Sequence, residues 1–172
     1  LGVWDWDVQK NELVWDDRMY ELYGVKRADF AGAYEAWLQG IHPDDRAASD
    51  EISRQARRGE RDYDTEFRVV WPDRSVHYLK AYGQFVRDAA GKPLRMTGIN
   101  YDITASKQAE AELYERERHS HSLLRLSKNL ERAQTYGQVL NAALDEVKTS
   151  LGYQSLWVYL LADDKQSFKA LV

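Results

Sequence analysis

Hydrophobic and polar residues alternate along several short stretches of the chain, with the two-residue period of β-strands. Residues 3–7 read V-W-D-W-D and place Trp4 and Trp6 on one face, and residues 12–15 form a second stretch close behind. Three later stretches are joined by short turns, P-D-R-S and A-G-K, and they cover residues 63–71, 76–87 and 94–103. Strands joined in this way predict an antiparallel meander.

Helix-forming patterns occupy the chain between the second and third of these strands. Asp16 is an N-cap for a helix over residues 17–23, which Gly24 ends. Pro43 suits the first turn of a longer helix that reaches about Arg58. An aromatic patch on short helical turns lies between the two helices and consists of Phe30, Tyr34 and Trp37. Five strands interrupted by a helical block predict an α+β fold.

The pattern changes after residue 104, because the chain then contains neither Gly nor Pro until residue 137. Residues 105–132 predict one long helix, and residues 138–151 predict a second, amphipathic helix. Residues 156–161 predict a strand before an acidic turn at residues 163–164. The long helix carries a heptad seam for a coiled coil, formed by Leu123, Leu126, Leu130 and Ala133, although the same frame places Arg116 and His119 in the preceding turns.

Composition removes several classes of function. The 24 basic and 28 acidic residues are well mixed and give a net charge of -4, so we expect neither nucleic acid nor an anionic membrane as a partner. Cysteine is absent, which excludes disulfides, thiolate nucleophiles and a cysteinyl-flavin adduct. The chain begins at Leu1 rather than Met and ends at the apolar Val172, so we expect it to be part of a longer protein.

Six short motifs occur in a fixed order over the first 104 residues, and a seventh follows them. The motifs are G-V-W-D-W-D (2–7), V-W-D-D-R-M-Y-E-L-Y-G (14–24), I-H-P-D-D-R (41–46), E-F-R (66–68), G-K-P (91–93), D-I-T (102–104) and K-Q-A-E (107–110). Together they closely resemble PAS domains of the third subgroup with their C-terminal PAC motif.

The resemblance implies a fold and a domain organisation. A PAS/PAC domain is expected over residues 1–104, with a five-stranded antiparallel sheet, the first strand beside the last, and a helical block on one face that encloses a small cavity. A helical linker is expected over residues 105–136. Residues 137–172 resemble the opening of a GAF domain, which is incomplete in this chain.

The resemblance also implies a sensory-input and relay function in a bacterial signalling protein of the histidine kinase or diguanylate cyclase type. The chain itself is then not an enzyme, and its expected partners are a second copy, a downstream GAF and output domain, and a small ligand, all in the cytoplasm. The last strand leads directly into the long helix, so changes in the sheet reach that helix. The relay residues are expected to be Trp4, Trp6, Asp102, Ile103 and Thr104.

A ligand pocket is expected among aromatic residues and one amide, namely Tyr34, Trp37, Phe67, Tyr82 and Asn100. These side chains could stack on a non-covalent flavin, although aromatics at such spacings are more often plain core. The alternative function is a ligand-free PAS domain that serves as a dimerisation and relay spacer. A cavity of about 300 Å³ or more would favour the sensor, and a filled core would favour the spacer.

Other candidate residues have simpler explanations. His42 precedes Pro43 and two carboxylates, which is typical of a turn and helix start rather than a metal or haem ligand, and no His follows in the next helix. His119 and His121 lack the residues that follow a phosphoacceptor histidine in kinases, so a solvated helix face is the interpretation. The paired Asp residues stand at turns and helix starts, and no catalytic or metal site is predicted.

Overall fold

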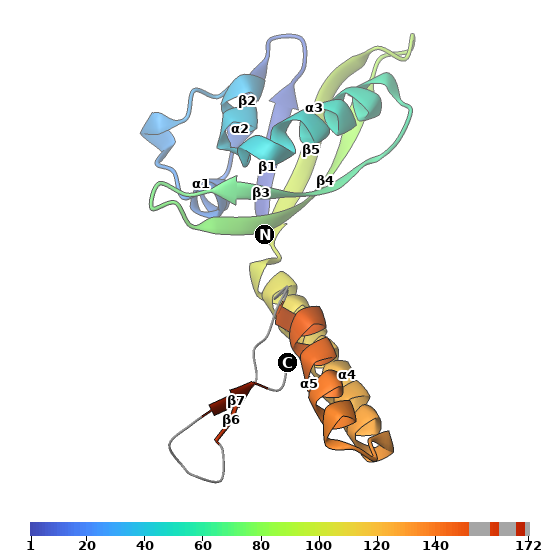
Figure 1. Ribbon diagram of the computed structural model, residues 1–172. Helices are drawn as coiled ribbons and strands as arrows, with labels where there is room; N and C mark the ends of the chain where they lie inside the picture. The colour runs from blue at the N-terminus through green and yellow to red at the C-terminus, as the bar shows by residue number, and fades with distance from the viewer. Residues whose placement is uncertain (152–158, 162–167, 171–172) are drawn as a thin grey trace. The chain divides into compact units, whose positions relative to one another are not determined.

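The computed structural model describes residues 1–151, 159–161 and 168–170. These residues divide into two compact units, 1–109 and 110–172. The first unit contains one antiparallel sheet with the strand order β2-β1-β5-β4-β3 (Figure 1). Its strands are β1 (Gly2–Asp7), β2 (Glu12–Trp15), β3 (Tyr63–Val70), β4 (Val76–Arg87) and β5 (Pro93–Asp102). The expected five-stranded sheet, with the first strand beside the last, is confirmed.

Four short helical segments join β2 to β3 and cover one face of this sheet (Figure 1). They are α1 (Asp17–Tyr23), η1 (Arg27–Asp29), α2 (Tyr34–Gly40) and α3 (Pro43–Arg58). The predicted caps of α1 are confirmed, because the Asp16 carboxylate accepts a hydrogen bond from the Met19 N–H at 2.8 Å and Gly24 adopts a φ of 63°. The helix α3 begins at Pro43 and ends before Gly59, as predicted.

The core lies between the helices and the sheet face that they cover. Alternate residues of β1 and β3 are buried, which is the expected pattern for strands with one covered face. The Trp4 indole lies across two glycines, one on the neighbouring strand β5 and one on β4 beyond it: a Cβ atom on Gly83 would lie 2.8 Å from a ring carbon of Trp4, and one on Gly98 would meet both that ring and the Tyr82 carbonyl oxygen. Glycine at these positions lets a large side chain pack flat on the sheet.

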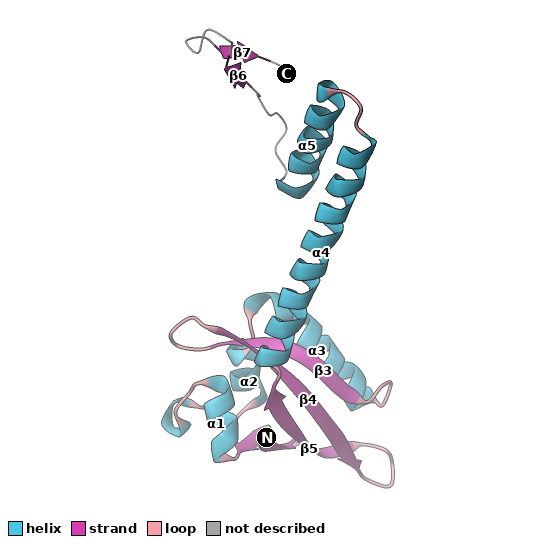
Figure 2. Ribbon diagram, turned by 90° about the horizontal axis from the view of Figure 1, so that it is seen from below, coloured by secondary structure: helices cyan, strands magenta, loops and turns pink. Residues whose placement is uncertain are grey.

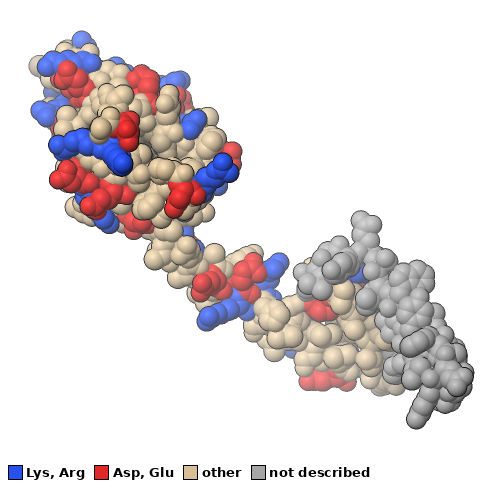
Figure 3. Space-filling model, turned by 90° about the vertical axis from the view of Figure 1, so that its left-hand side faces the viewer, with Lys and Arg blue, Asp and Glu red and all other residues tan. Residues whose placement is uncertain are grey.

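The opposite sheet face carries paired charges. Lys80 on β4 lies 2.5 Å from Asp64 on β3, and Arg95 on β5 lies 2.6 Å from Asp5 on β1. Figure 3 shows Lys and Arg interspersed with Asp and Glu over the face that it presents. The mixed charge of the sequence is therefore also mixed on this surface.

The second unit contains α5 (Tyr136–Leu151), β6 (Tyr159–Leu161) and β7 (Phe168–Ala170), together with most of α4 (Thr104–Arg132), which starts in the first unit (Figure 2). Arg125 of α4 forms an ion pair of 2.8 Å with Glu146 of α5. The helix α5 starts two residues earlier than predicted and includes Gly137. Of the strand predicted over residues 156–161, the last three form β6, whereas residues 156–158 and the acidic turn at 163–164 lie outside the described residues.

Candidate functional site

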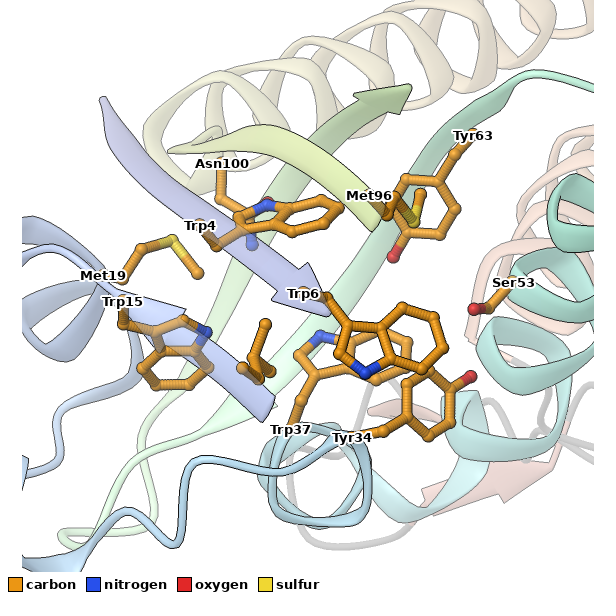
Figure 4. A pocket seen from close by; sticks show the side chains of 11 residues that line it. Trp4, Trp6, Trp15, Met19, Tyr34, Trp37, Ser53, Tyr63, Met96 and Asn100 are labelled. Carbon is orange, nitrogen blue, oxygen red and sulfur yellow. The ribbon is translucent and has the colours of Figure 1, made fainter. Parts of the chain in front are cut away.

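An apolar cavity of about 30 Å³ lies between the sheet and the helices (Figure 4). Four indole rings contribute to its wall, from β1, β2 and α2. The lining residues are Trp4, Trp6, Leu13, Trp15, Met19, Tyr34, Trp37, Ser53, Tyr63, Met96 and Asn100. This volume leaves room for two or three water molecules, since each needs roughly 10–15 Å³.

A buried chain of hydrogen bonds crosses one side of the cavity. The Trp4 indole N–H donates to the Asn100 side-chain oxygen at 2.8 Å, and the Asn100 amide donates to the Tyr23 hydroxyl at 3.3 Å. Asn100 is 1% exposed, so both bonds are shielded from water. Because a buried polar group without a partner is costly, these two hydrogen bonds fix the position of β1 against β5 and α1.

A second polar cluster stands at the mouth of the cavity. Asn11 adopts a φ of 56°, which Asn tolerates better than most residues, and its side-chain oxygen accepts hydrogen bonds from the Trp6 indole at 3.1 Å and the Tyr34 backbone N–H at 3.2 Å. The Trp6 and Tyr34 rings stack at 4.8 Å, and the Tyr34 hydroxyl donates to Asp50 at 3.1 Å. The turn between β1 and β2 thereby holds α2 over the pocket.

The buried tyrosines of this region are neutral hydrogen-bonding groups. Burial is the main cause that raises the pKa of Tyr23, Tyr34 and Tyr63 above the usual value of 10.0. Their hydroxyls therefore stay protonated at physiological pH, and none of them is available as a base. The cavity can accommodate a small neutral molecule, but these tyrosines do not provide acid–base chemistry.

Three of the five predicted pocket residues line the cavity, namely Tyr34, Trp37 and Asn100. Phe67 is buried and meets the Trp37 ring edge-on at 6.1 Å, but it lies outside the lining. Tyr82 does not belong to the pocket. It is 38% exposed on the opposite sheet face, where its ring lies 6.3 Å from that of Tyr101. The reason is strand alternation: Ala81 faces the core, so its neighbour faces away.

Sequence reasoning missed several lining residues. Trp15 and Tyr63 alternate with exposed neighbours in β2 and β3, which is the pattern that could have identified them. Met96 carries the same mark, since it lies between the exposed Arg95 and Thr97 in β5. Met19 and Ser53 carry no such mark, because their place in the cavity depends on how α1 and α3 pack. Trp4 and Trp6, predicted for the relay, also line the cavity.

A flavin does not fit this cavity. Pockets for ligands of that size usually measure about 300–1,000 Å³, whereas the lining side chains here pack ring against ring and leave about 30 Å³. His42 is not among the lining residues, and its ring accepts a hydrogen bond from the Asp44 N–H at the start of α3. Within the described ranges, no three His, Asp or Glu side chains gather as metal ligands would.

The exit from the sheet into α4 is held by specific hydrogen bonds. The Asp102 carboxylate accepts from the Thr104 N–H at 2.7 Å, at the first residue of α4. The Thr104 hydroxyl accepts from the Tyr78 N–H at 2.9 Å, and the Ile103 N–H donates to the Tyr78 carbonyl oxygen at 2.9 Å. These bonds connect the start of the helix to β4, so the three predicted exit residues lie together.

An ion pair adds a second connection at the same place. Lys107, in the first turns of α4, lies 2.9 Å from Glu66 of β3, and this hydrogen bond is the main cause that lowers the pKa of Glu66. Glu66 also lies 3.5 Å from Lys80 of β4. The first turns of α4 are therefore connected to two strands of the sheet.

Comparison with protein families identifies one match: the family model described as PAS fold matches residues 12–100. Among curated proteins, a probable diguanylate cyclase, DgcE, of Escherichia coli (strain K12) is 27% identical over 124 residues, which are 72% of this chain but 11% of that protein. The chain therefore spans about a tenth of the length of this relative. Among the residues that the structure describes, no helix has the length and apolar character needed to cross a membrane.

Solved structures are similar to a large part of the chain. One is a sensory box histidine kinase/response regulator from Burkholderia thailandensis E264, with a TM-score of 0.60, 25% identity, and coverage of 70% of this chain and 89% of that chain. Another is the N-terminal domain of a diguanylate cyclase with a PAS/PAC sensor from Marinobacter aquaeolei, with a TM-score of 0.56, 19% identity, and coverage of 62% and 97%. The second likeness concerns the fold alone.

Proposed function

Because this chain belongs to the PAS fold family, we propose that it is a sensory-input and signal-relay module of a bacterial signal-transduction protein of the histidine kinase or diguanylate cyclase type. The exit from the sheet is the observation that carries the proposal. β5 passes into α4 within two residues, the Asp102 carboxylate caps the start of the helix, and the Thr104 hydroxyl ties it to β4. Movement of β4 or β5 therefore moves the helix start with it. The catalytic output then belongs to another part of a longer protein.

The relay is tested by replacing Asp102 and a matched residue. Asp102→Ala removes the hydrogen bond to the α4 start, whereas Asp88→Ala removes a comparable turn cap, since the Asp88 carboxylate accepts from the Ala90 N–H at 2.9 Å and the Lys92 N–H at 2.8 Å. Each variant should lose about 1 kcal/mol of unfolding free energy. Kinase or cyclase activity of the full-length protein should change several-fold only in Asp102→Ala. Equal changes in both variants would contradict the relay.

The cavity volume favours the alternative in which the PAS domain relays without a ligand of cofactor size. A filled core of indole and phenol rings leaves space only for water or an equally small neutral molecule. The absorbance of the purified chain and its native mass test this directly. We expect Trp and Tyr absorbance only, with no mass lost on unfolding. A flavin or haem band, or a released ligand, would contradict the ligand-free relay and support a cofactor sensor.

The second unit supplies the rest of the proposal. Leu123 and Leu130 are 54% and 38% exposed on α4, and we propose that this seam pairs with a second copy of the chain in a cytoplasmic homodimer, with residues 137–172 opening a GAF-like domain. The native mass distinguishes a monomer from a dimer. A dimer should dissociate in the variant Leu123→Asp, because this change places a charge in the seam. A monomer in the unmodified chain would contradict the pairing.

A further inference from the structure

His77 of β4 lies against the residue that starts the exit helix. Its ring stacks on Trp71 with 3.9 Å between centroids and an interplanar angle of 20°, and its side chain is 22% exposed. The two ring nitrogens face different partners: Nε2 lies 3.0 Å from the Ser75 hydroxyl, and Nδ1 lies 3.9 Å from an oxygen of the Asp102 carboxylate. Capping and sheet pairing do not require a histidine at this position.

The neighbouring turn determines which nitrogen carries the proton. The Ser75 hydroxyl and N–H both donate to the Asp73 carboxylate, at 2.6 and 2.9 Å, and the hydroxyl bond is the main cause that lowers the pKa of Asp73. Because the Ser75 hydrogen is committed to Asp73, the Ser75 oxygen can only accept from His77. Neutral His77 therefore carries its proton on Nε2 and presents the bare Nδ1 to Asp102.

We propose that His77 is a pH-dependent positioning residue for the Asp102 cap, an inference that rests on the relay function proposed above. A second proton can enter only at Nδ1, which then becomes a donor that faces the Asp102 carboxylate. The resulting ion pair holds one oxygen of Asp102 while the other oxygen continues to accept from the Thr104 N–H. The start of α4 is thus more firmly attached to β4 when His77 is charged.

Charged groups from the β3–β4 turn, the end of β5 and the start of α4 surround His77. The negative charges near the ring belong to Asp73 in the β3–β4 turn and Asp102 at the end of β5, and the face of the Trp71 ring lies against it. The positive charges nearby are Arg74 in the same turn and the start of the α4 dipole. From α1, the uncharged Leu22 carbonyl accepts a hydrogen bond from the Trp71 indole at 3.0 Å.

Hydrogen exchange of the amides of residues 104–108, expressed as protection factors, tests the proposal in the 172-residue chain. The protection factors should rise about 2- to 5-fold as the pH falls from about 8 to 5.5. This is the size of effect expected from a partly exposed ion pair. His77→Gln keeps a neutral N–H donor toward Ser75, and Asp102→Asn keeps a capping oxygen without the charge. Both variants should lose the pH response, whereas the control His42→Gln should keep it.

Two results would overturn the inference. One is an unchanged pH response in His77→Gln, and the other is a proton on Nδ1 rather than Nε2 at about pH 8, read from the ring ¹⁵N shifts. These measurements are local, so they are independent of output activity. A pH response that depends on His77 supports the inference even if Asp102→Ala and Asp88→Ala affect output equally, in which case only the relay function fails.

Discussion

Replacing Asn100 by Ala should destabilise the first unit more than any exposed substitution on the same sheet. The change removes the acceptor of the Trp4 indole N–H at 2.8 Å and the donor to Tyr23 at 3.3 Å. Trp4 is 8% exposed, so its N–H is left without a partner, at a cost of about 1–3 kcal/mol. The second lost bond adds about 0.5–1.5 kcal/mol. We therefore expect a loss of about 1.5–4.5 kcal/mol in unfolding free energy, summed from these two contributions.

Urea unfolding followed by tryptophan fluorescence measures this loss, since five of the six Trp residues lie in the first unit. A double-mutant cycle with Trp4→Phe isolates the indole bond, because Phe keeps an aromatic ring but has no N–H donor. Asn100→Ala should cost at least about 1 kcal/mol less in the Trp4→Phe background. Gln84→Ala, on the exposed face of β4, is the control and should stay within about 0.5 kcal/mol of the unmodified chain. A loss below about 0.5 kcal/mol for Asn100→Ala, or simple additivity in the cycle, would refute the reasoning.

Further predictions concern packing and acid stability. Phe67→Ala should cost about 3–5 kcal/mol in urea unfolding and Tyr82→Ala less than about 1 kcal/mol, because one ring is buried and the other is 38% exposed; similar losses would contradict the assigned faces. Gly98→Ala should lower the thermal midpoint, since its Cβ atom would overlap the indole ring above it, and an unchanged midpoint would count against that packing. Hydrogen bonds from Arg68 lower the pKa of Asp45 below 3.8, so the stability they provide is present above that value and is lost as the pH falls through the lowered pKa. The stability difference between the unmodified chain and Asp45→Asn should therefore shrink in acid unfolding below about pH 4, and a constant difference would oppose this assignment.

Much of the fold could be predicted from local patterns. The bounds of α1 and β4 agree with the sequence prediction, because an N-cap aspartate, a terminal glycine and turn residues act within a few positions along the chain. The helix α5 starts two residues before the predicted start at residue 138, and Gly137 lies inside it. A helix can include one glycine at a modest cost, which neighbouring residues offset.

The pocket was predicted less completely, and Tyr82 shows why. Both faces of β4 carry apolar residues, since Tyr82 and Val86 face outward while Leu79 and Ala81 face the core. Alternation then indicates a strand but not which of its faces is covered. The side that receives the helices depends on pairing with β3 and β5, which a single strand does not encode.

The sequence by itself determined the order and type of the elements, because caps, turns and alternation are short-range effects. Only the tertiary structure decided the cavity volume, since about 30 Å³ is what remains after rings from distant segments have packed together. It likewise brought His77 to Asp102, 25 positions later in the chain, through the pairing of β4 with β5. Interactions of this kind depend on the register of strands and on the space between layers, and both arise only when the whole domain folds.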